Sequence, residues 1–266
     1  MTLAGGIIVA AFVAVALVGP LIVSRDPIAQ DLAQRLGGPS RDHPFGSDSL
    51  GRDVFTRVIY GTRISLVAGS TVVLAATAFG IMAGMLAGWN GGWSDETLMR
   101  ITDMFLAFPS LILAMAISAI LRPNLTNALL AIAVTSWPVY ARMARAQVLS
   151  LRGREYVEAA RAEGATDLVI LARHLIPNAV APILVQATLE VGNIILISAG
   201  LSFIGFGAQP PTPEWGLMVS EGRRFLMDQW WIATFPAMAI LLLVLGFNLV
   251  GDGVRDLMDP RLRKVG

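Results

Sequence analysis

Six long apolar stretches constrain this 266-residue chain more than any other feature of its sequence. They lie at about residues 4–23, 64–89, 102–121, 126–146, 180–207 and 232–251. An α-helix needs about 20 apolar residues to cross a bilayer, and each stretch reaches that length. The composition agrees, because only 15% of the residues are charged, whereas soluble domains carry about 25%. We therefore expect an all-α integral membrane protein with six transmembrane helices.

The sequence lacks the residues that several kinds of chemistry require. Cysteine is absent, which excludes thiolate metal sites, and His43 and His174 are too far apart for a zinc motif on one helix. The only lysine, Lys264, follows Arg263, so the chain has no phosphate-binding loop ending in Gly-Lys-Ser/Thr. A formal net charge of +1 gives no basic surface for nucleic acid. We expect a non-catalytic chain without a metal, a cofactor or a nucleic-acid partner of its own.

Six spans place both chain termini on the same side of the membrane, and the charges indicate which side. With cytoplasmic termini, the inner segments carry eleven of the 20 Lys and Arg residues. The positive-inside rule therefore favours this orientation by a small margin. The first apolar stretch has no basic region before it and is longer than the core of a signal peptide, about 7–15 residues, so we expect a retained helix.

The spans divide the chain into three predicted parts. Residues 1–63 form the first helix and an outer amphipathic segment, residues 64–251 form a five-helix core, and residues 252–266 form a cytoplasmic tail. Within the first part, residues 49–60 are predicted to lie as an amphipathic helix along the outer membrane interface. Its apolar face comprises Leu50, Val54 and Val58, and its polar face comprises Arg52, Asp53 and Arg57.

Two features inside the spans suggest packing and function. Gly80, Gly84 and Gly88 repeat every four residues, a small-residue stripe that allows another helix backbone to approach closely. Glu190 lies in the middle of a span, where a charge is costly and often functional. Glu190 either lines a transport path or faces the bundle, where Asn193 or a neighbouring helix satisfies its carboxyl group.

A polar segment at residues 155–178 interrupts the apolar spans. Arg154 to Glu163 reads as a short helix with Tyr156, Val157 and Ala160 on its apolar face. Gly164 suits a left-handed residue after the helix, Thr166 suits the cap of a second helix at Asp167 to His174, and Pro177 is expected to stop it. This helix-turn-helix balances its arginines with acidic residues, which argues against DNA binding. It either docks on another protein or lies on the membrane.

The segment resembles the EAA loop of permeases from ATP-binding-cassette importers. The sequence EAARAEG at residues 158–164 is followed thirteen residues later by the proline of HLIPN. The matching residues are Glu158, Ala159, Ala160, Gly164, Ile176 and Pro177. The resemblance implies a type I importer permease fold in which loop 152–178 is cytoplasmic and its short coupling helices sit in a groove of the ATPase subunit.

Two further stretches resemble the dipeptide and oligopeptide branch of these importers, and within it the C-type permease. They are RDHPFGSDSLGRDVFTRVIYGTRISL at residues 41–66 and GLSFIGFGAQPPTPEWG at residues 200–216. One position departs from the branch, which commonly has Glu where this chain has Ser198, while Glu190 lies two helical turns earlier. The candidate residues of the translocation path are Glu190, Asn193 and Ser198.

The resemblance implies a subunit of a peptide importer in the bacterial cytoplasmic membrane that works by alternating access. It also implies the partners, namely a homologous second permease, two ATPase subunits that bind ATP and Mg, and an extracytoplasmic substrate-binding protein. Related branches import nickel chelates, glutathione or haem, and these substrates remain alternatives. A secondary transporter or channel, which needs neither nucleotide nor a docking loop, is the more distant alternative, and an intramembrane enzyme is a third.

Overall fold

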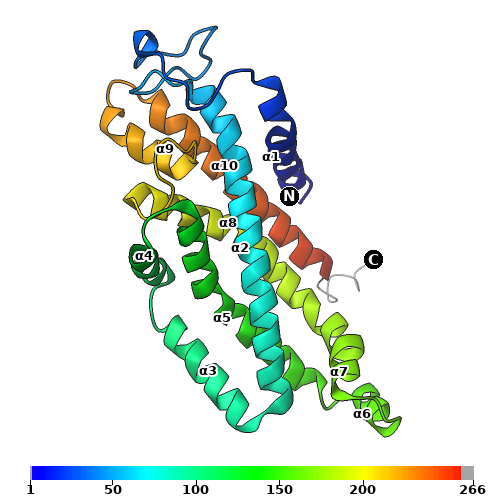
Figure 1. The fold of residues 1–266 in the computed structure, drawn as a ribbon. Coiled ribbons are helices and arrows are strands. Elements are labelled where there is room, and N and C mark those ends of the chain that lie inside the picture. Colours follow the sequence, from blue (N-terminus) through cyan, green and yellow to red (C-terminus); the bar gives the residue numbers. More distant parts are fainter. Residues whose placement is uncertain (1, 259–266) are drawn as a thin grey trace.

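A computed structural model describes residues 2–258 as an elongated bundle of helices (Figure 1). Within this range the chain has helices, connecting segments and one isolated β-bridge, between Ser47 and Asp53. The α-helices are α1 (Thr2–Ile22), α2 (Val54–Asn90), α3 (Gly92–Leu106), α4 (Ser110–Leu121), α5 (Leu125–Leu151), α6 (Glu155–Ala162), α7 (Asp167–Ile170), α8 (Ile176–Ile204), α9 (Trp215–Gly222) and α10 (Trp231–Met258).

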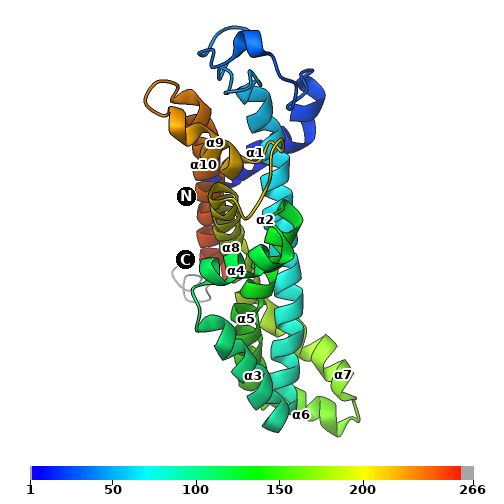
Figure 2. The same cartoon turned by 60° about the vertical axis from the view of Figure 1, so that its left-hand side comes forward.

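The bundle has two distinct ends, which are visible in both views (Figures 1 and 2). We call them the α9 end, which also carries the connecting segment at residues 23–53, and the α6 end, which also carries α7 and most of α3. Helix α10 continues to Met258, so the first residues of the predicted tail extend this helix. Residues 259–266 of that tail lie outside the described part of the chain.

Four helices are long and apolar enough to cross a membrane. They are α1, α2, α10 and a continuous helix over Asp167–Ile204 that joins α7 to α8. Helices α3 and α4 together could form a fifth span. Helix α5 contains the predicted span 126–146 over 27 residues, but Arg142 and Arg145 lower the hydropathy of its second half. The all-helical, multi-span fold class is therefore confirmed.

The predicted span at residues 102–121 is not one continuous helix. The chain leaves the helix after Leu106 and starts α4 at Ser110, and the axes of α3 and α4 differ by 92°. Pro109 explains the position of the break, because proline lacks an N–H group and disfavours a helical conformation at the preceding Phe108.

The predicted amphipathic helix at residues 49–60 is also wrong. Helix α2 begins at Val54 and runs for 37 residues, so most of the predicted segment forms its first turns. The Asp53 carboxylate caps α2 by accepting hydrogen bonds from the Thr56 N–H at 2.8 Å and the Thr56 hydroxyl at 2.6 Å. The predicted polar face is buried rather than turned toward water.

The stripe of small residues in α2 packs against α5, as the sequence predicted. A Cβ atom on Gly84 would lie 2.1 Å from the Ala141 carbonyl oxygen, and one on Gly80 would lie 2.6 Å from the Trp137 carbonyl oxygen. Larger side chains would therefore push the two helices apart. This close contact makes α2 and α5 a tightly packed pair.

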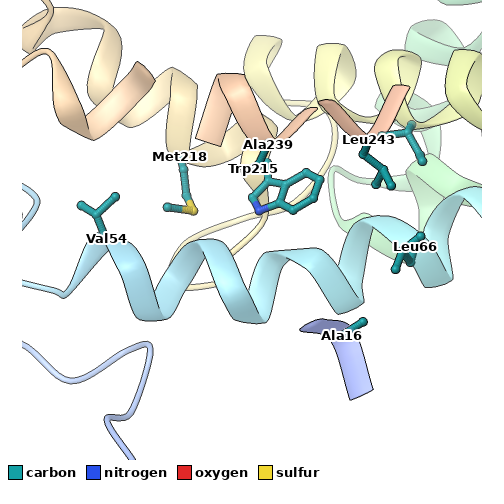
Figure 3. Close-up of a cluster of buried hydrophobic side chains, with 8 residues drawn as sticks. Ala16, Val54, Leu66, Trp215, Met218, Ala239 and Leu243 are labelled. Atoms are coloured by element: carbon teal, nitrogen blue, oxygen red, sulfur yellow. The ribbon is translucent and has the colours of Figure 1, made fainter. Parts of the chain in front are cut away.

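A hydrophobic core lies toward the α9 end, where Trp215 is fully buried (Figure 3). The Trp215 indole N–H donates to the Val58 carbonyl oxygen at 2.9 Å, which links α9 to α2. The cluster joins five helices, α1, α2, α8, α9 and α10. Its buried members are Ala16, Val54, Leu66, Ile195, Trp215, Met218, Ala239 and Leu243.

Candidate functional site

The interhelical loop at residues 152–178 contains the predicted turn between two helices. Helix α6 ends at Ala162, and Gly164 adopts a φ of +86°. The Gly164 N–H donates to the Arg161 carbonyl at 2.9 Å, and the Ala165 N–H donates to the Ala160 carbonyl at 3.0 Å. These two bonds form a Schellman motif, in which glycine is preferred because it adopts positive φ without strain. The prediction for Gly164 is confirmed.

The loop rests on the membrane helices through an apolar base. Val157 and Ala160 of α6 and Ile170 of α7 are buried in one cluster with Met85 of α2 and Val148 of α5. This burial keeps the loop in a fixed position under the α2–α5 pair. Tyr156 was predicted to share this face, but it is 39% exposed and its ring lies 6.3 Å from that of His174.

The second predicted helix of the loop does not stop at Pro177. A π-helical turn at Leu171–Leu175 joins α7 directly to α8, with the Ile176 N–H donating to the Leu171 carbonyl. Pro177 is the second residue of α8 and follows the π-helical turn inside the continuous helix Asp167–Ile204, so it does not end the helix. Thr166 stands at the start of α7 but its side chain makes no capping hydrogen bond. The loop is therefore mechanically continuous with a membrane helix.

Most residues of the predicted docking motif lie on the surface. Glu158, Ala159, Gly164 and Pro177 are exposed, and Ile176 is 38% exposed. The exception is Ala160, which lies in the apolar base. The motif thus combines one side chain that anchors the loop with a surface that no part of residues 2–258 covers.

Arginines around the loop bind neighbouring helices, and the sequence did not indicate these contacts. Arg145 of α5 forms a two-pronged ion pair with Asp95 of α3, with Nε–Oδ1 at 2.5 Å and Nη2–Oδ2 at 2.7 Å. The Arg161 guanidinium of α6 lies 4.7 Å from the ring centroid of Trp89 at the end of α2. Two more arginines act similarly, since Arg152, directly after α5, donates to the Gly88 carbonyl and Arg142 of α5 donates to Asp103.

The three candidate path residues on α8 do not form one group. Glu190 accepts hydrogen bonds from Asn193 at 2.8 Å and from Gln186 at 3.3 Å, all within the same helix. Glu190 is half-buried and Asn193 is exposed. Ser198 is 4% exposed and lies apart from them. The carboxyl group is thus satisfied locally, while the Glu190–Asn193 pair still reaches the surface of this chain.

At the α9 end, a buried ion network replaces the predicted water-facing arginines. Arg52 and Arg57 are each 1% exposed. Arg52 donates from Nε to Asp48 at 2.6 Å and from Nη2 to Glu221 at 2.8 Å. Arg57 donates to the carbonyl oxygens of Pro27 and Pro211. The network links the connecting segment at residues 23–53 to Glu221 of α9 and to Pro211, which precedes α9.

Glu214 is a second buried acid near this network. It is 3% exposed, and its carboxylate caps α9 by accepting from the Leu217 N–H at 2.8 Å. Burial raises the pKa of the Glu214 carboxyl above its ordinary value, although the hydrogen bonds from Leu217 and Gly216 oppose this shift. Glu214, Arg52 and Arg57 are therefore all held away from solvent at this end of the molecule.

Comparison with known proteins identifies the fold and its family. Residues 80–264 match the family described as "Binding-protein-dependent transport system inner membrane component". The chain belongs to this family. Among relatives of this permease is the dipeptide transport system permease protein DppC of Alkalihalophilus pseudofirmus, 46% identical over 99% of this chain and 86% of that protein.

Other relatives of the permease carry related names. The probable D,D-dipeptide transport system permease protein DdpC of Escherichia coli is 46% identical over 98% of this chain and 88% of that protein. The glutathione transport system permease protein GsiD of Pectobacterium atrosepticum is 47% identical over 85% of this chain and 75% of that protein. These matches confirm the resemblance to importer permeases that the loop motif first indicated.

A solved structure shares the fold of the permease. It belongs to the MetNI methionine ABC transporter in an inward-facing conformation. The TM-score is 0.60 at 20% identity, and the match covers 77% of this chain and 98% of that chain. The fold class predicted from the sequence, that of an ABC importer permease, is therefore confirmed.

Proposed function

We propose that this permease is the transmembrane subunit of a bacterial ATP-driven importer of dipeptides or oligopeptides. The observation that carries the proposal is the identity of 46% over 263 residues to a protein named as a dipeptide transport permease. The geometry of the interhelical loop supports an ATP-driven mechanism. The loop exposes most of the docking motif, packs on the membrane helices through its apolar residues and continues directly into α8. Alternating access would follow from movement of this loop.

The proposed partners follow from the loop surface and from the family. Two ATPase subunits bind ATP and Mg, and one of them docks on Glu158, Ala159, Gly164, Ile176 and Pro177, while Ala160 anchors the loop. A homologous second permease completes the path across the membrane. A substrate-binding protein delivers the peptide at the α9 end. In this arrangement the α6 end and both termini are cytoplasmic.

The proposed path includes the polar surface of α8. Glu190 and Asn193 reach the surface of this chain and would face the path between the two permeases. Ser198 is buried here, so its part in the path requires a rearrangement of the helices around it. A carboxylate turned toward lipid would be costly, by at least ~2.5 kcal/mol, which supports an orientation toward a water-filled space.

Glutathione is the second candidate substrate. Relatives 46–47% identical to this chain are named as glutathione transport permeases. Glutathione is itself a tripeptide, so the same path chemistry serves both candidates. ATPase activity of the purified complex with its binding protein distinguishes them, since the true substrate stimulates hydrolysis at the lowest concentration.

Single cysteines test the orientation and the path in one experiment. The chain has no cysteine, so Ala162→Cys and Met227→Cys report on the two ends through a membrane-impermeant thiol reagent. On intact cells we expect Met227→Cys to react and Ala162→Cys to react only after the membrane is opened. The reverse pattern would contradict a cytoplasmic loop and with it the proposed ATPase contact.

The same reagents test the path on α8. We expect Asn193→Cys to react, because the reaction requires water at the thiol. Leu184→Cys is the matched control, since Leu184 is 48% exposed and lies nine residues earlier, on the opposite face of the helix. Equal reactivity of the two cysteines would show that Asn193 does not line a water-filled path.

A further inference from the structure

Helix α3 is attached to the bundle by ionic contacts with α5 and by Ile101 and Phe105, which pack against the apolar cluster around Trp137. Thr102 is the only buried residue of α3, and its hydroxyl donates to the Leu98 carbonyl within the same helix. The Arg145–Asp95 pair holds its first turn, and Arg142 contacts Asp103 near its end. Beyond Leu106 the chain turns through 92° into α4. The position of α3 therefore depends in part on Arg142 and Arg145 of α5, which bind the carboxylates of α3.

The Arg145–Asp95 pair is suited to carry force. Its side chains are 34% and 18% exposed, so the pair is partly shielded from water. Two parallel N–H···O bonds fix the orientation as well as the distance between the two helices. Asp95 also lies in the first turn of α3, where a negative charge is favourable.

Helix α6 contacts the same region from the other side. Arg161 places its guanidinium over Trp89, directly before the turn at Gly91 that starts α3. The Trp89 ring also packs against the apolar base of the interhelical loop. A displacement of α6 therefore reaches the α2–α3 junction through Trp89 and reaches α3 through α5 and Asp95.

We propose that the Arg145–Asp95 pair, together with Arg161 on Trp89, transmits movement of the interhelical loop to α3. This inference rests on the proposed function, because it assumes that an ATPase moves the loop. Asp95 and Arg145 are then positioning residues, which set the place of α3 and α4 during transport. None of the four residues belongs to the docking motif.

The test uses the complete complex in liposomes and measures ATP hydrolysis and uptake of labelled peptide together. We expect Asp95→Arg and Arg145→Asp each to retain the ATPase subunits and lower the peptide transported per ATP about fivefold or more. The double swap rebuilds the pair with reversed polarity and should bring the ratio back to within about twofold of wild type. Asp95→Asn, which keeps the shape, should lower the ratio in the same direction.

The matched control is the Arg100–Glu96 pair on the same helix. Its atoms are 3.8 Å apart and its side chains are 76% and 69% exposed, so swapping it should leave the ratio unchanged. The inference is overturned if the single swaps of Asp95 and Arg145 leave the ratio unchanged, or if the double swap is no better than either single. Failure of the wild-type chain to retain any ATPase would instead contradict the proposed function.

Discussion

The two ends of this permease hold their connecting segments in different ways. At the α9 end, Arg52 and Arg57 are fully buried and bind groups of the chain itself. At the α6 end, the interhelical loop is held by apolar residues, and its charged side chains, such as Glu158, remain exposed. The buried network at the α9 end is thus satisfied by the chain itself, whereas the loop at the α6 end presents charges that a second molecule can bind.

This comparison distinguishes charges that stabilise the fold from charges that can bind a partner. A buried charge whose partners all lie in the chain cannot be given up without a large cost in stability. An exposed charge contributes little to folding and is free to contact a partner. The contrast can be tested by substitutions at each end, which should affect stability at the α9 end and assembly at the α6 end.

The largest effect is expected for Arg52→Met. This change leaves Asp48 and Glu221 without their main partner and should lower the free energy of unfolding by about 3–5 kcal/mol. Thermal unfolding of the detergent-solubilised permease measures the loss. Arg25→Met is the control, because Arg25 is 44% exposed and lies 3.8 Å from Asp53. A similar loss for both variants would contradict the distinction between buried and exposed charges.

An intermediate effect is expected for Gly164→Val at the other end. A Cβ atom there meets nothing within 4 Å, so the cost arises only from the positive φ and amounts to about 1–3 kcal/mol. We expect the variant to insert and to pair with the second permease, but to retain less ATPase on purification and to support less uptake.

Gly153→Val is the matched control for this substitution. Gly153 lies in the same loop, a Cβ atom added there would also meet nothing within 4 Å, and its backbone does not have the positive φ of Gly164. Uptake should therefore stay near the wild-type level. Equal losses in the two variants would show that the backbone turn at Gly164 does not position the docking surface.

The smallest effect is expected from Glu214 and depends on pH. Because burial raises the pKa of Glu214 above its ordinary value of 4.5, the folded protein keeps a proton that the unfolded chain releases. Its contribution to stability is fully present below about pH 4.5 and is lost as the pH rises through the raised pKa. Glu214→Gln should flatten this part of the profile.

Unfolding midpoints of the wild type and of Glu214→Gln, measured over the same pH series, give the contribution as a difference. Glu221→Gln is a useful comparison, because Glu221 is 25% exposed and contacts Arg52. A difference between wild type and Glu214→Gln that does not change with pH would show that Glu214 has the same protonation state in the folded and unfolded chains.

Local signals in the sequence predicted much of this fold. The apolar stretches other than 102–121, the glycine stripe of α2 and the turn at Gly164 depend on neighbouring residues alone, and each is found in the structure. The buried state of Arg52 could not be predicted, because its partner Glu221 is 169 residues away. Pro109 explains where α3 and α4 separate, but the sequence did not predict the angle of 92° between them.

The π-helical turn, which the sequence analysis did not predict, has a consequence for chain length. The buried positions Ile170, Leu175, Ala179 and Ile183 are separated by five residues, then four, then four. Deleting one residue within Leu171–Leu175 would make the first interval four, which an ordinary α-helix satisfies. Deleting one farther along α8 would rotate all later side chains by about 100°. The π-helical turn between α7 and α8 thus contains one residue more than an α-helix needs at this place. A chain one residue shorter within this turn can therefore keep the same packing.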